Sequence, residues 1–459
     1  MSNGTDQILE PFTLPQTLLL GTATAATQIE GGNIDHSWAR WARAGRTVDG
    51  SQTSPADDHW NRVDEDAAIL VELGCRIYRM SVEWARIEPE PGVFDGEVLA
   101  HYRREIETLK AAGIEPLLTL HHFTNPLWFE DSGGWLRKDA PAIFERFARH
   151  VVEALADIVS DWVVINEPNV FALNGYLLAE WPPGHSKLGE YLKCARNMIR
   201  AHKRCYLMIH RIRNGLGFSG TMVGSAIHFR VFDPAGKGLL DLFASSAFAY
   251  LFHHAFVEGI VRGRFTLPLK RPHRREFPRM PGKLWSDFVG VNYYSRELIR
   301  FGLGGELLVG KRVLVPGVPR NDLGWEIYPE GLERVAGSVY RKYNLPVYVT
   351  ENGTCDREDR FRTRYLYEHL AAVKRIIEAG VDLRRYYHWT LLDNFEWSEG
   401  VSARFGLVEV DFATQERRIR PSGRFFARVA NDRGVTADCL SEFRSQLHHR
   451  GVHDATTTD

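Results

Sequence analysis

The chain has 459 residues, which corresponds to roughly three domains at ~150 residues each unless one large fold uses the whole length. Its 57 Lys and Arg residues balance 58 Asp and Glu residues, so no global charge attracts it to nucleic acid or to an anionic membrane. A hydrophobic content of 44% and a charged content of 25% exclude the disordered and fibrous classes. Aromatic residues make up 12% of the chain, including 12 Trp, which is more flat apolar surface than a core of this size requires.

The spacing of the cysteines and the sequence of the first residues bear on the location of the protein and on its cofactors. The 5 cysteines form no C-x-x-C pair, so we expect free thiols rather than disulfides or a zinc site. Met1–Glu10 lacks the features of a signal peptide, and no run of about 18 apolar residues occurs. We therefore expect a cytoplasmic protein without a membrane span, a metal or another cofactor.

Short apolar runs alternate with longer amphipathic segments along the whole chain. The apolar runs are predicted strands, and they are Leu18–Ala23, Arg76–Ser81, Glu115–His121, Trp162–Asn166, Met222–His228, Asp287–Asn292, Val347–Glu351 and Tyr386–Leu391. The predicted helices between them are Glu97–Ala112, Pro141–Val159, Tyr191–Arg213, Leu240–Glu258, Pro329–Tyr343 and Thr363–Ala379.

Eight strands separated by helices, without an internal linker, predict a single α/β domain, a (β/α)8 TIM barrel over residues 11–447, and a disordered tail over 448–459. The alternative is a pair of doubly wound domains. No Gly-x-Gly-x-x-Gly follows the first strand and no phosphate-loop sequence occurs, so a nucleotide-binding domain is disfavoured. The barrel is the favoured fold.

Two predicted strands end in a carboxylate directly after an apolar run. Glu167 follows Val163–Asn166, and Glu351 follows Val347–Thr350. Active sites of such barrels lie at the C-terminal ends of the strands, so the two side chains should face each other. Glycoside hydrolysis requires this pair, one acid that protonates the leaving oxygen and one carboxylate that attacks the sugar or activates water.

A structural role for these glutamates is the alternative, because most glutamates are solvated. It is disfavoured here, since a carboxylate after a buried strand needs either a partner or a function. Arg79, at the end of the second strand, is a candidate partner that would keep a nucleophilic carboxylate ionised, although it would serve equally well in a structural ion pair.

Eight motifs in chain order resemble glycoside hydrolase family 1, the β-glucosidase family, from about Pro11 to Arg444. They are Thr22–Gly31, Tyr78–Ile87, Thr119–Phe123, Asn166–Pro168, Asn292–Tyr294, Gly324–Ile327, Thr350–Gly353 and Leu392–Trp397. The resemblance implies that Glu167 is the general acid/base and Glu351 the nucleophile of a retaining double displacement. Supporting roles are implied for Arg79, Asn292 and Tyr294.

The resemblance also implies the residues that contact the substrate. Trp389 would form a stacking floor, and Trp325 would line the leaving-group side. The other residues implied to bind the sugar are Gln28, His122, Asn166, Glu396, Trp397, Glu399 and Phe405.

One departure bears on the substrate class. Relatives that act on 6-phosphorylated sugars carry a Ser after the Trp397 motif and a Lys and a Tyr farther along, whereas this chain has Glu399, Arg404 and Phe405. A carboxylate repels phosphate, so we expect a small, unphosphorylated β-glycoside.

The favoured function is therefore an exo-acting retaining β-glucosidase acting on cellobiose, short oligosaccharides and aryl or alkyl β-glucosides. The alternatives are a broader β-galactosidase and β-fucosidase activity, an endo-glycanase of a related barrel family, or a non-catalytic sugar-binding barrel. The Gly302–Asn321 segment is predicted to form a hairpin near the mouth of the site, and the basic Lys270–Lys283 segment is predicted to be a solvated loop.

Overall fold

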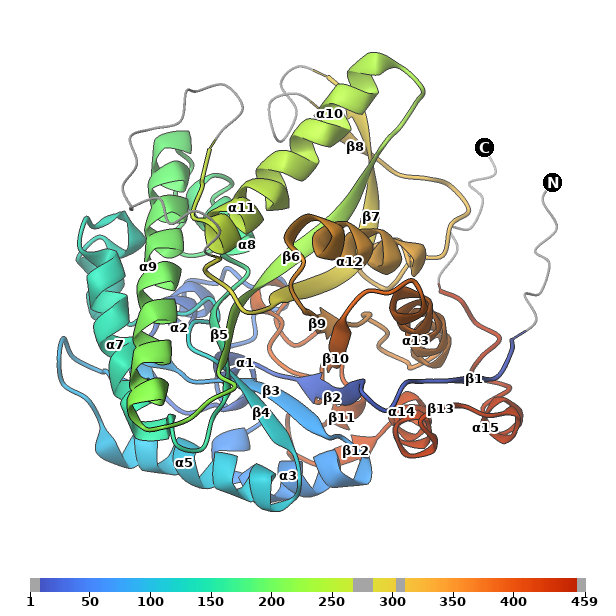
Figure 1. Cartoon of the computed structure of the whole chain (residues 1–459), viewed down its shortest axis with the longest axis horizontal. Coiled ribbons are helices and arrows are strands. Elements are labelled where there is room, and N and C mark those ends of the chain that lie inside the picture. Colours follow the sequence, from blue (N-terminus) through green and yellow to red (C-terminus); the bar gives the residue numbers. More distant parts are fainter. Residues whose placement is uncertain (1–8, 267–283, 303–309, 452–459) are drawn as a thin grey trace.

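A computed structural model describes residues 9–266, 284–302 and 310–451, and its centre is a closed ring of eight parallel strands (Figure 1). The ring strands are β2 (Leu19–Ala23), β3 (Ile77–Ser81), β4 (Glu115–Thr119), β5 (Asp161–Asn166), β6 (Met222–Pro234), β7 (Val289–Phe301), β9 (Val347–Asn352) and β10 (Leu383–Trp389). They pair in the order β6-β5-β4-β3-β2-β10-β9-β7, and β6 pairs with β7 to close the ring. The (β/α)8 barrel expected from the sequence is confirmed.

Helices surround the ring, as Figure 1 shows. The long helices are α3 (Val63–Glu72), α5 (Gly96–Ala111), α7 (Ala140–Leu155), α9 (Leu188–Gly215), α10 (Leu239–Ala249), α11 (Ala255–Arg262), α12 (Glu330–Tyr343), α13 (Arg362–Glu378) and α14 (Pro421–Asp432). In α7, Phe144, Phe147, Val151 and Leu155 recur at helical spacing and are fully buried, so one face of the helix packs on the barrel.

Short elements fill the connections at both ends of the barrel. The short helices are α1 (Ala26–Ile29), α2 (Ser37–Arg43), α4 (Trp84–Ile87), α6 (Leu127–Asp131), α8 (Pro168–Tyr176) and α15 (Ala437–Glu442). The short strands are β1 (Phe12–Thr13), β8 (Gly310–Val313), β11 (Val408–Val410), β12 (Arg417–Ile419) and β13 (Gly434–Val435).

The hydrophobic core has an inner and an outer part. The inner cluster lies inside the barrel and contains Ala23, Ile77, Leu117, Val163, Ala226, Phe288, Tyr348 and Tyr387. The same cluster continues through Tyr294 of β7, Trp389 at the end of β10 and Phe405 of the segment after β10. The packed interior of the barrel therefore leads directly into the aromatic floor of the candidate site.

Several observed elements differ in their bounds from the predicted ones. Strands β6 and β7 extend past the ring to Pro234 and Phe301, because they continue to pair with each other and β7 also pairs with β8. The predicted strand Tyr386–Leu391 ends at Trp389. The predicted helix Leu240–Glu258 is divided by a π-helical turn at Tyr250–His254.

Parts of the predicted segments lie outside the described residues. Within the Gly302–Asn321 segment, Gly310–Val313 pairs with Leu298–Phe301, which precedes the segment, so the pairing differs from the predicted hairpin; residues 303–309 lie outside the described residues. The Lys270–Lys283 segment is likewise outside the described residues. Of the predicted tail, residues 448–451 are described, and Arg450 pairs with Glu368 at 2.9 Å.

Among the helices in the described part of the chain, none combines the length and the apolar character that crossing a bilayer requires.

Candidate active site

The two carboxylates predicted from the strand ends lie at the same end of the barrel. Glu167 follows β5 and Glu351 is the fifth residue of β9, and they are only 5% and 4% exposed. Asn292 of β7 donates from Nδ2 to Oε1 of Glu167 at 2.7 Å and to Oδ1 of Asn166 at 3.1 Å. Parallel strands thus bring residues distant in sequence to one polar cluster.

Arg79 of β3 links Glu351 to Asn166, the neighbour of Glu167. Its Nη1 donates to Oε1 of Glu351 at 2.5 Å, and its Nη2 donates to Oδ1 of Asn166 at 2.7 Å. Its Nε donates to Thr119, and the whole side chain is 0% exposed. Arg79 therefore contacts Glu351, and its guanidinium is held by Glu351, Asn166 and Thr119.

The oxygens of Glu351 and the amide of Asn292 have defined partners. Tyr294 donates from its hydroxyl to Oε2 of Glu351 at 2.6 Å, so each oxygen of Glu351 accepts one hydrogen bond. Thr350 donates to Oδ1 of Asn292 at 2.6 Å, which orients the Asn292 amide nitrogen towards Glu167. Only its position directly before Glu351 singles out Thr350 in the sequence.

The backbone at Glu167 is strained. Its φ of 40° and ψ of 57° lie in the left-handed region, which a residue with a long side chain rarely adopts. The amide of Glu167 donates to the carbonyl of Ala226 at 2.8 Å, and Pro168 begins helix α8 immediately afterwards. These neighbours hold the turn that aims Glu167 into the site.

Burial dominates the protonation of Glu351. It raises the pKa of Glu351 to about 7, while Arg79 and the Tyr294 hydroxyl act to lower this pKa and Glu167 acts to raise it. The expected role of Arg79 in favouring the ionised form is therefore correct in direction. Burial is nevertheless the stronger effect on this carboxyl.

Gln28 and Glu396 form a second polar group at this end of the barrel. Gln28 donates from Nε2 to Asn394, to the carbonyl of Phe395 and to Oε2 of Glu396, at 3.0, 3.0 and 3.2 Å. Its Oε1 is buried and has no hydrogen-bond partner, so it is a free acceptor. Burial raises the pKa of Glu396 to about 8, and the charge of Glu351 also raises it. A sugar hydroxyl would satisfy both side chains.

Aromatic rings accompany these polar groups. His122 stacks 5.9 Å from Trp389 and 5.9 Å from Trp397, and its Nε2 lies 3.0 Å from the Asn166 amide nitrogen. Trp325 lies 5.8 Å from Tyr294 and 6.0 Å from Phe405. The predicted sugar-binding and leaving-group residues therefore belong to one continuous group.

Glu399 lies at the edge of the site, in the short helical turn Trp397–Glu399. Its pKa is raised by partial burial and by the nearby carboxylate of Asp49. Asp49 also accepts a hydrogen bond from the amide of Val401 at 2.8 Å. This edge is therefore acidic, and Asp49 was not identified from the sequence.

His228 of β6, expected from the sequence only as the end of an apolar run, also reaches this site. Its Nδ1 lies 3.3 Å from Oε1 of Glu167, and both side chains are less than a tenth exposed. Its partner on the adjacent strand β7 is Asn292, which reaches the same oxygen.

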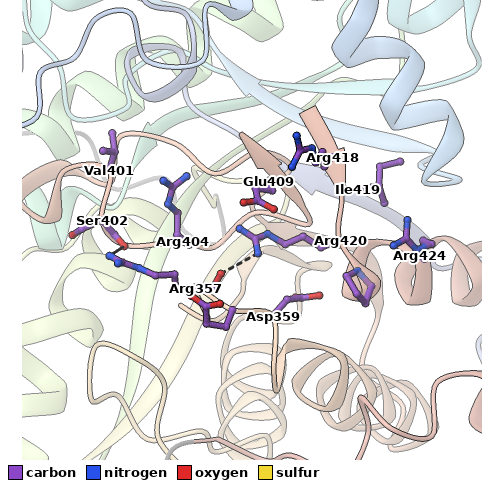
Figure 2. Close-up of a pocket in the computed structure, with 12 residues that line it drawn as sticks. Arg357, Asp359, Val401, Ser402, Arg404, Glu409, Arg418, Ile419, Arg420 and Arg424 are labelled. Carbon is purple, nitrogen blue, oxygen red and sulfur yellow. Dashed lines mark hydrogen bonds between the residues drawn. The ribbon is translucent and has the colours of Figure 1, made fainter. Parts of the chain in front are cut away.

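A cavity of about 910 Å³ lies beside this site and is distinct from it (Figure 2). Arg357, Arg404 and Arg420 line it, and Arg420 donates to the Arg357 carbonyl at 3.0 Å. Arg404 and Arg420 share the carboxylate of Asp393. None of the predicted sugar-binding residues lines this cavity, so it does not belong to the carboxylate pair.

Comparison with known proteins places the chain in a family. The model of glycosyl hydrolase family 1 matches residues 11–435. Beta-glucosidase A of Acetivibrio thermocellus is 32% identical, over 93% of this chain and 100% of that protein. Beta-glucosidase A of Thermotoga maritima is 32% identical, over 92% of this chain and 98% of that protein.

Solved structures agree with this placement. A beta-glycosidase from Pyrococcus horikoshii superposes with a TM-score of 0.86 at 33% identity, covering 95% of this chain and 98% of that chain. The family 1 β-glucosidase from Thermotoga maritima gives a TM-score of 0.85 at 32% identity, covering 93% and 100%. The chain belongs to glycosyl hydrolase family 1.

Proposed function

We propose that this protein is a retaining, exo-acting β-glucosidase that releases β-D-glucose from short oligosaccharides and from aryl or alkyl β-glucosides. The observation that carries the proposal is the pair of buried carboxylates, Glu167 and Glu351, joined through Asn292, Asn166 and Arg79. The names of the relatives from Acetivibrio thermocellus and Thermotoga maritima support the β-glucoside substrate.

In the first half of the proposed reaction, ionised Glu351 attacks the anomeric carbon while Glu167 gives its proton to the glycosidic oxygen. In the second half, Glu167 removes a proton from water, whose oxygen attacks the same carbon and releases Glu351. Arg79 and Tyr294 each donate to one oxygen of Glu351 and so hold the nucleophile in place.

The sugar itself would lie against Trp389, since C–H faces of sugars pack on aromatic rings. Gln28, through its unpartnered Oε1, and Glu396 would bind hydroxyl groups at the edge of the sugar. Asn166 would contact the 2-hydroxyl, where hydrogen bonds strengthen in the transition state. The acidic edge formed by Glu399 and Asp49 favours an unphosphorylated glycone.

A β-galactosidase activity is a second candidate. The β-galactosidase of Saccharolobus solfataricus is 29% identical to this chain, and the Thermotoga maritima β-glucosidase has been solved with galacto-hydroximolactam. Breakdown of cellulose-derived sugars and a cytoplasmic location stay predictions from the sequence.

The test is a set of two variants measured on aryl β-glucosides. Glu351→Ala should lower hydrolysis by at least about 10⁴-fold on every glucoside, because the nucleophile is lost. Glu167→Ala should lower hydrolysis by about 10²- to 10⁴-fold on poor leaving groups, and by less on good ones, since these need no proton. Azide should restore part of the Glu167→Ala activity. Full activity of Glu351→Ala would contradict the proposal, and cleavage inside long glucans would instead favour an endo-glycanase.

A further inference from the structure

Arg230 fixes the protonation pattern of His228. Both residues lie on β6, and Nε of Arg230 donates to Nε2 of His228 at 3.2 Å. An arginine nitrogen is always a donor, so Nε2 of His228 has to be the accepting, unprotonated nitrogen. The ring proton then lies on Nδ1, the atom that faces Oε1 of Glu167 at 3.3 Å.

The position of Arg230 is itself fixed. Its Nη1 forms an ion pair with Glu297 of β7, and Glu297 pairs with Arg312 of β8 at 3.2 Å. The Arg230 guanidinium also lies 5.8 Å from the ring of Phe252 and 5.7 Å from that of Trp325. The long β6–β7 pair beyond the barrel therefore supports the donor that orders His228.

Asn292 donates a hydrogen bond to Oε1 of Glu167, and a nitrogen of His228 lies close to the same oxygen. Asn292 donates from Nδ2 to Oε1 at 2.7 Å, and Nδ1 of His228 faces the same Oε1 from the neighbouring strand. In a protonated carboxyl group the oxygen that accepts two hydrogen bonds is the carbonyl oxygen, and the other oxygen carries the proton.

We propose that His228 is a positioning residue for Glu167, held by Arg230 as the Nδ1–H tautomer, and that it makes Oε2 of Glu167 the oxygen that exchanges the proton. During glycosylation the proton leaves Oε2 for the glycosidic oxygen as that oxygen separates from the anomeric carbon and Glu351 bonds to the carbon. During deglycosylation Oε2 takes the proton of the attacking water. His228 keeps its own proton throughout, and the inference rests on the proposed glycosidase function.

The contact of 3.3 Å is slightly longer than an ordinary N–H···O bond, and such contacts commonly tighten when substrate binds. The ring of His228 is held by its surroundings. It lies 5.5 Å from the ring of Phe252 and 5.5 Å from that of Tyr294, and its backbone carbonyl accepts from Asn169 at 3.0 Å.

Three variants separate positioning from a merely structural role. The amide of Asn can place an N–H close to where Nδ1 of His lies, whereas Leu has no donor, so His228→Asn is the matched control for His228→Leu. Arg230→Leu leaves the ring in place but removes the group that selects the tautomer. The activity readout is kcat/KM on β-glucosides with poor leaving groups, such as alkyl glucosides, against a dinitrophenyl β-glucoside, which needs no acid.

We expect His228→Leu and Arg230→Leu to lose about 10-fold on the poor leaving groups and less than about 3-fold on the dinitrophenyl glucoside. His228→Asn should stay within about 3-fold of the unmodified protein on both substrates. An equal loss on both substrates, or a loss in His228→Asn as large as in His228→Leu, would overturn the proposal. Thermal unfolding of each variant identifies any that fail to fold.

Nitrogen NMR of the unmodified protein, labelled at histidine, gives a result that does not depend on activity or on variant folding. The signal that is missing in His228→Asn identifies His228. We expect Nδ1 to be protonated and Nε2 unprotonated, and protonation at Nε2 would overturn the proposal. Failure of the unmodified protein to hydrolyse the dinitrophenyl glucoside would contradict the proposed function instead, whatever the tautomer.

Discussion

At the scale of single residues, the chemistry depends on how each oxygen of the two glutamates is used. Both oxygens of Glu351 accept hydrogen bonds, from Arg79 and from Tyr294. Burial nevertheless raises the pKa of Glu351 to about 7. Because the nucleophile has to be ionised, its protonation should limit the reaction at acidic pH.

The pH profile of Tyr294→Phe tests this balance. In the unmodified protein, the acidic limb of kcat/KM for an aryl β-glucoside should rise with pH up to about pH 7. The Tyr294 hydroxyl stabilises the ionised form of Glu351, so its loss should raise the pKa of Glu351 and move the acidic limb to higher pH. A hydrogen bond to a charged group is worth about 1.5 kcal/mol or more, which corresponds to a shift of about one pH unit. An unmoved limb, or one at lower pH, would count against this role of Tyr294.

The site residues that follow or interrupt apolar runs could be predicted from the sequence, whereas those that act through a neighbouring side chain could not. Glu167 and Glu351 stand at strand ends, where a polar residue after a buried run is conspicuous, whereas Arg79, expected at the end of its strand, is the third residue of β3 and stands out as a cation within an apolar run. Thr350, Asp49 and the contact of His228 with Glu167 depend on which strands are adjacent and on how side chains turn. Such pairings are tertiary facts that no local pattern in one sequence encodes.

At the scale of elements, the end of β9 has to pass very close to the end of β10. A Cβ atom added at Gly353, directly after β9, would lie 1.8 Å from the carbonyl oxygen of Trp389. Backbone has to shift to relieve such an overlap. Since Glu351 is the last residue but one of β9 and Trp389 is the last residue of β10, any shift separates the proposed nucleophile from the proposed sugar-binding floor.

We therefore expect Gly353→Ala to lower the free energy of unfolding by about 2 kcal/mol and kcat/KM by more than about 10-fold. Gly96→Ala is the matched control, because the added Cβ meets nothing within 4 Å at the start of α5. That control should be neutral or slightly stabilising. Urea unfolding and aryl β-glucoside kinetics give both quantities, and equal behaviour of the two variants would refute the close-approach argument.

The elements themselves followed from the sequence where the pattern was local. All eight ring strands overlap the predicted apolar runs, and they follow one another in the expected order along the chain. The extensions of β6 and β7 were not foreseen, because they are stabilised by mutual pairing rather than by burial on both faces. The π-helical turn at Tyr250–His254 likewise leaves no signal in an otherwise helical apolar pattern.

At the scale of the whole molecule, a buried acidic network ties the loops after β2 and β3 to the outer helices. Glu30 is 4% exposed and accepts hydrogen bonds from Tyr102 of α5 and from Arg86 of α4, at 2.7 and 3.1 Å. Burial raises the pKa of Glu30 to about 7, and Arg86 and Tyr102 act to lower it. Between pH 4.5 and about pH 7, Glu30 therefore keeps its proton in the folded protein, whereas in the unfolded chain it has already released it.

Stability should consequently fall as the pH rises through this window. Below the usual pKa of 4.5 both states bind the proton and the contribution of Glu30 is complete; it is lost as the pH rises to about 7. The difference between the pKa of Glu30 in the folded protein and its usual value corresponds to about 3 kcal/mol of unfolding free energy. Glu30→Gln stays neutral at every pH, so the difference in the free energy of unfolding between the unmodified protein and the variant should change by about that amount across the window. Urea unfolding at several pH values measures this difference, and a difference between the two proteins that does not change with pH would contradict the role of Glu30.

The central claim is that Glu351 becomes covalently bonded to the sugar. A β-glucoside with fluorine at the 2-position and a good leaving group should form the glycosyl-enzyme faster than water can remove it, so that the adduct accumulates. Mass spectrometry of peptides from the inactivated protein should place one fluoroglucosyl group on the peptide that contains Glu351. An adduct on another residue, or turnover of glucosides with inversion of configuration and no adduct, would contradict the account.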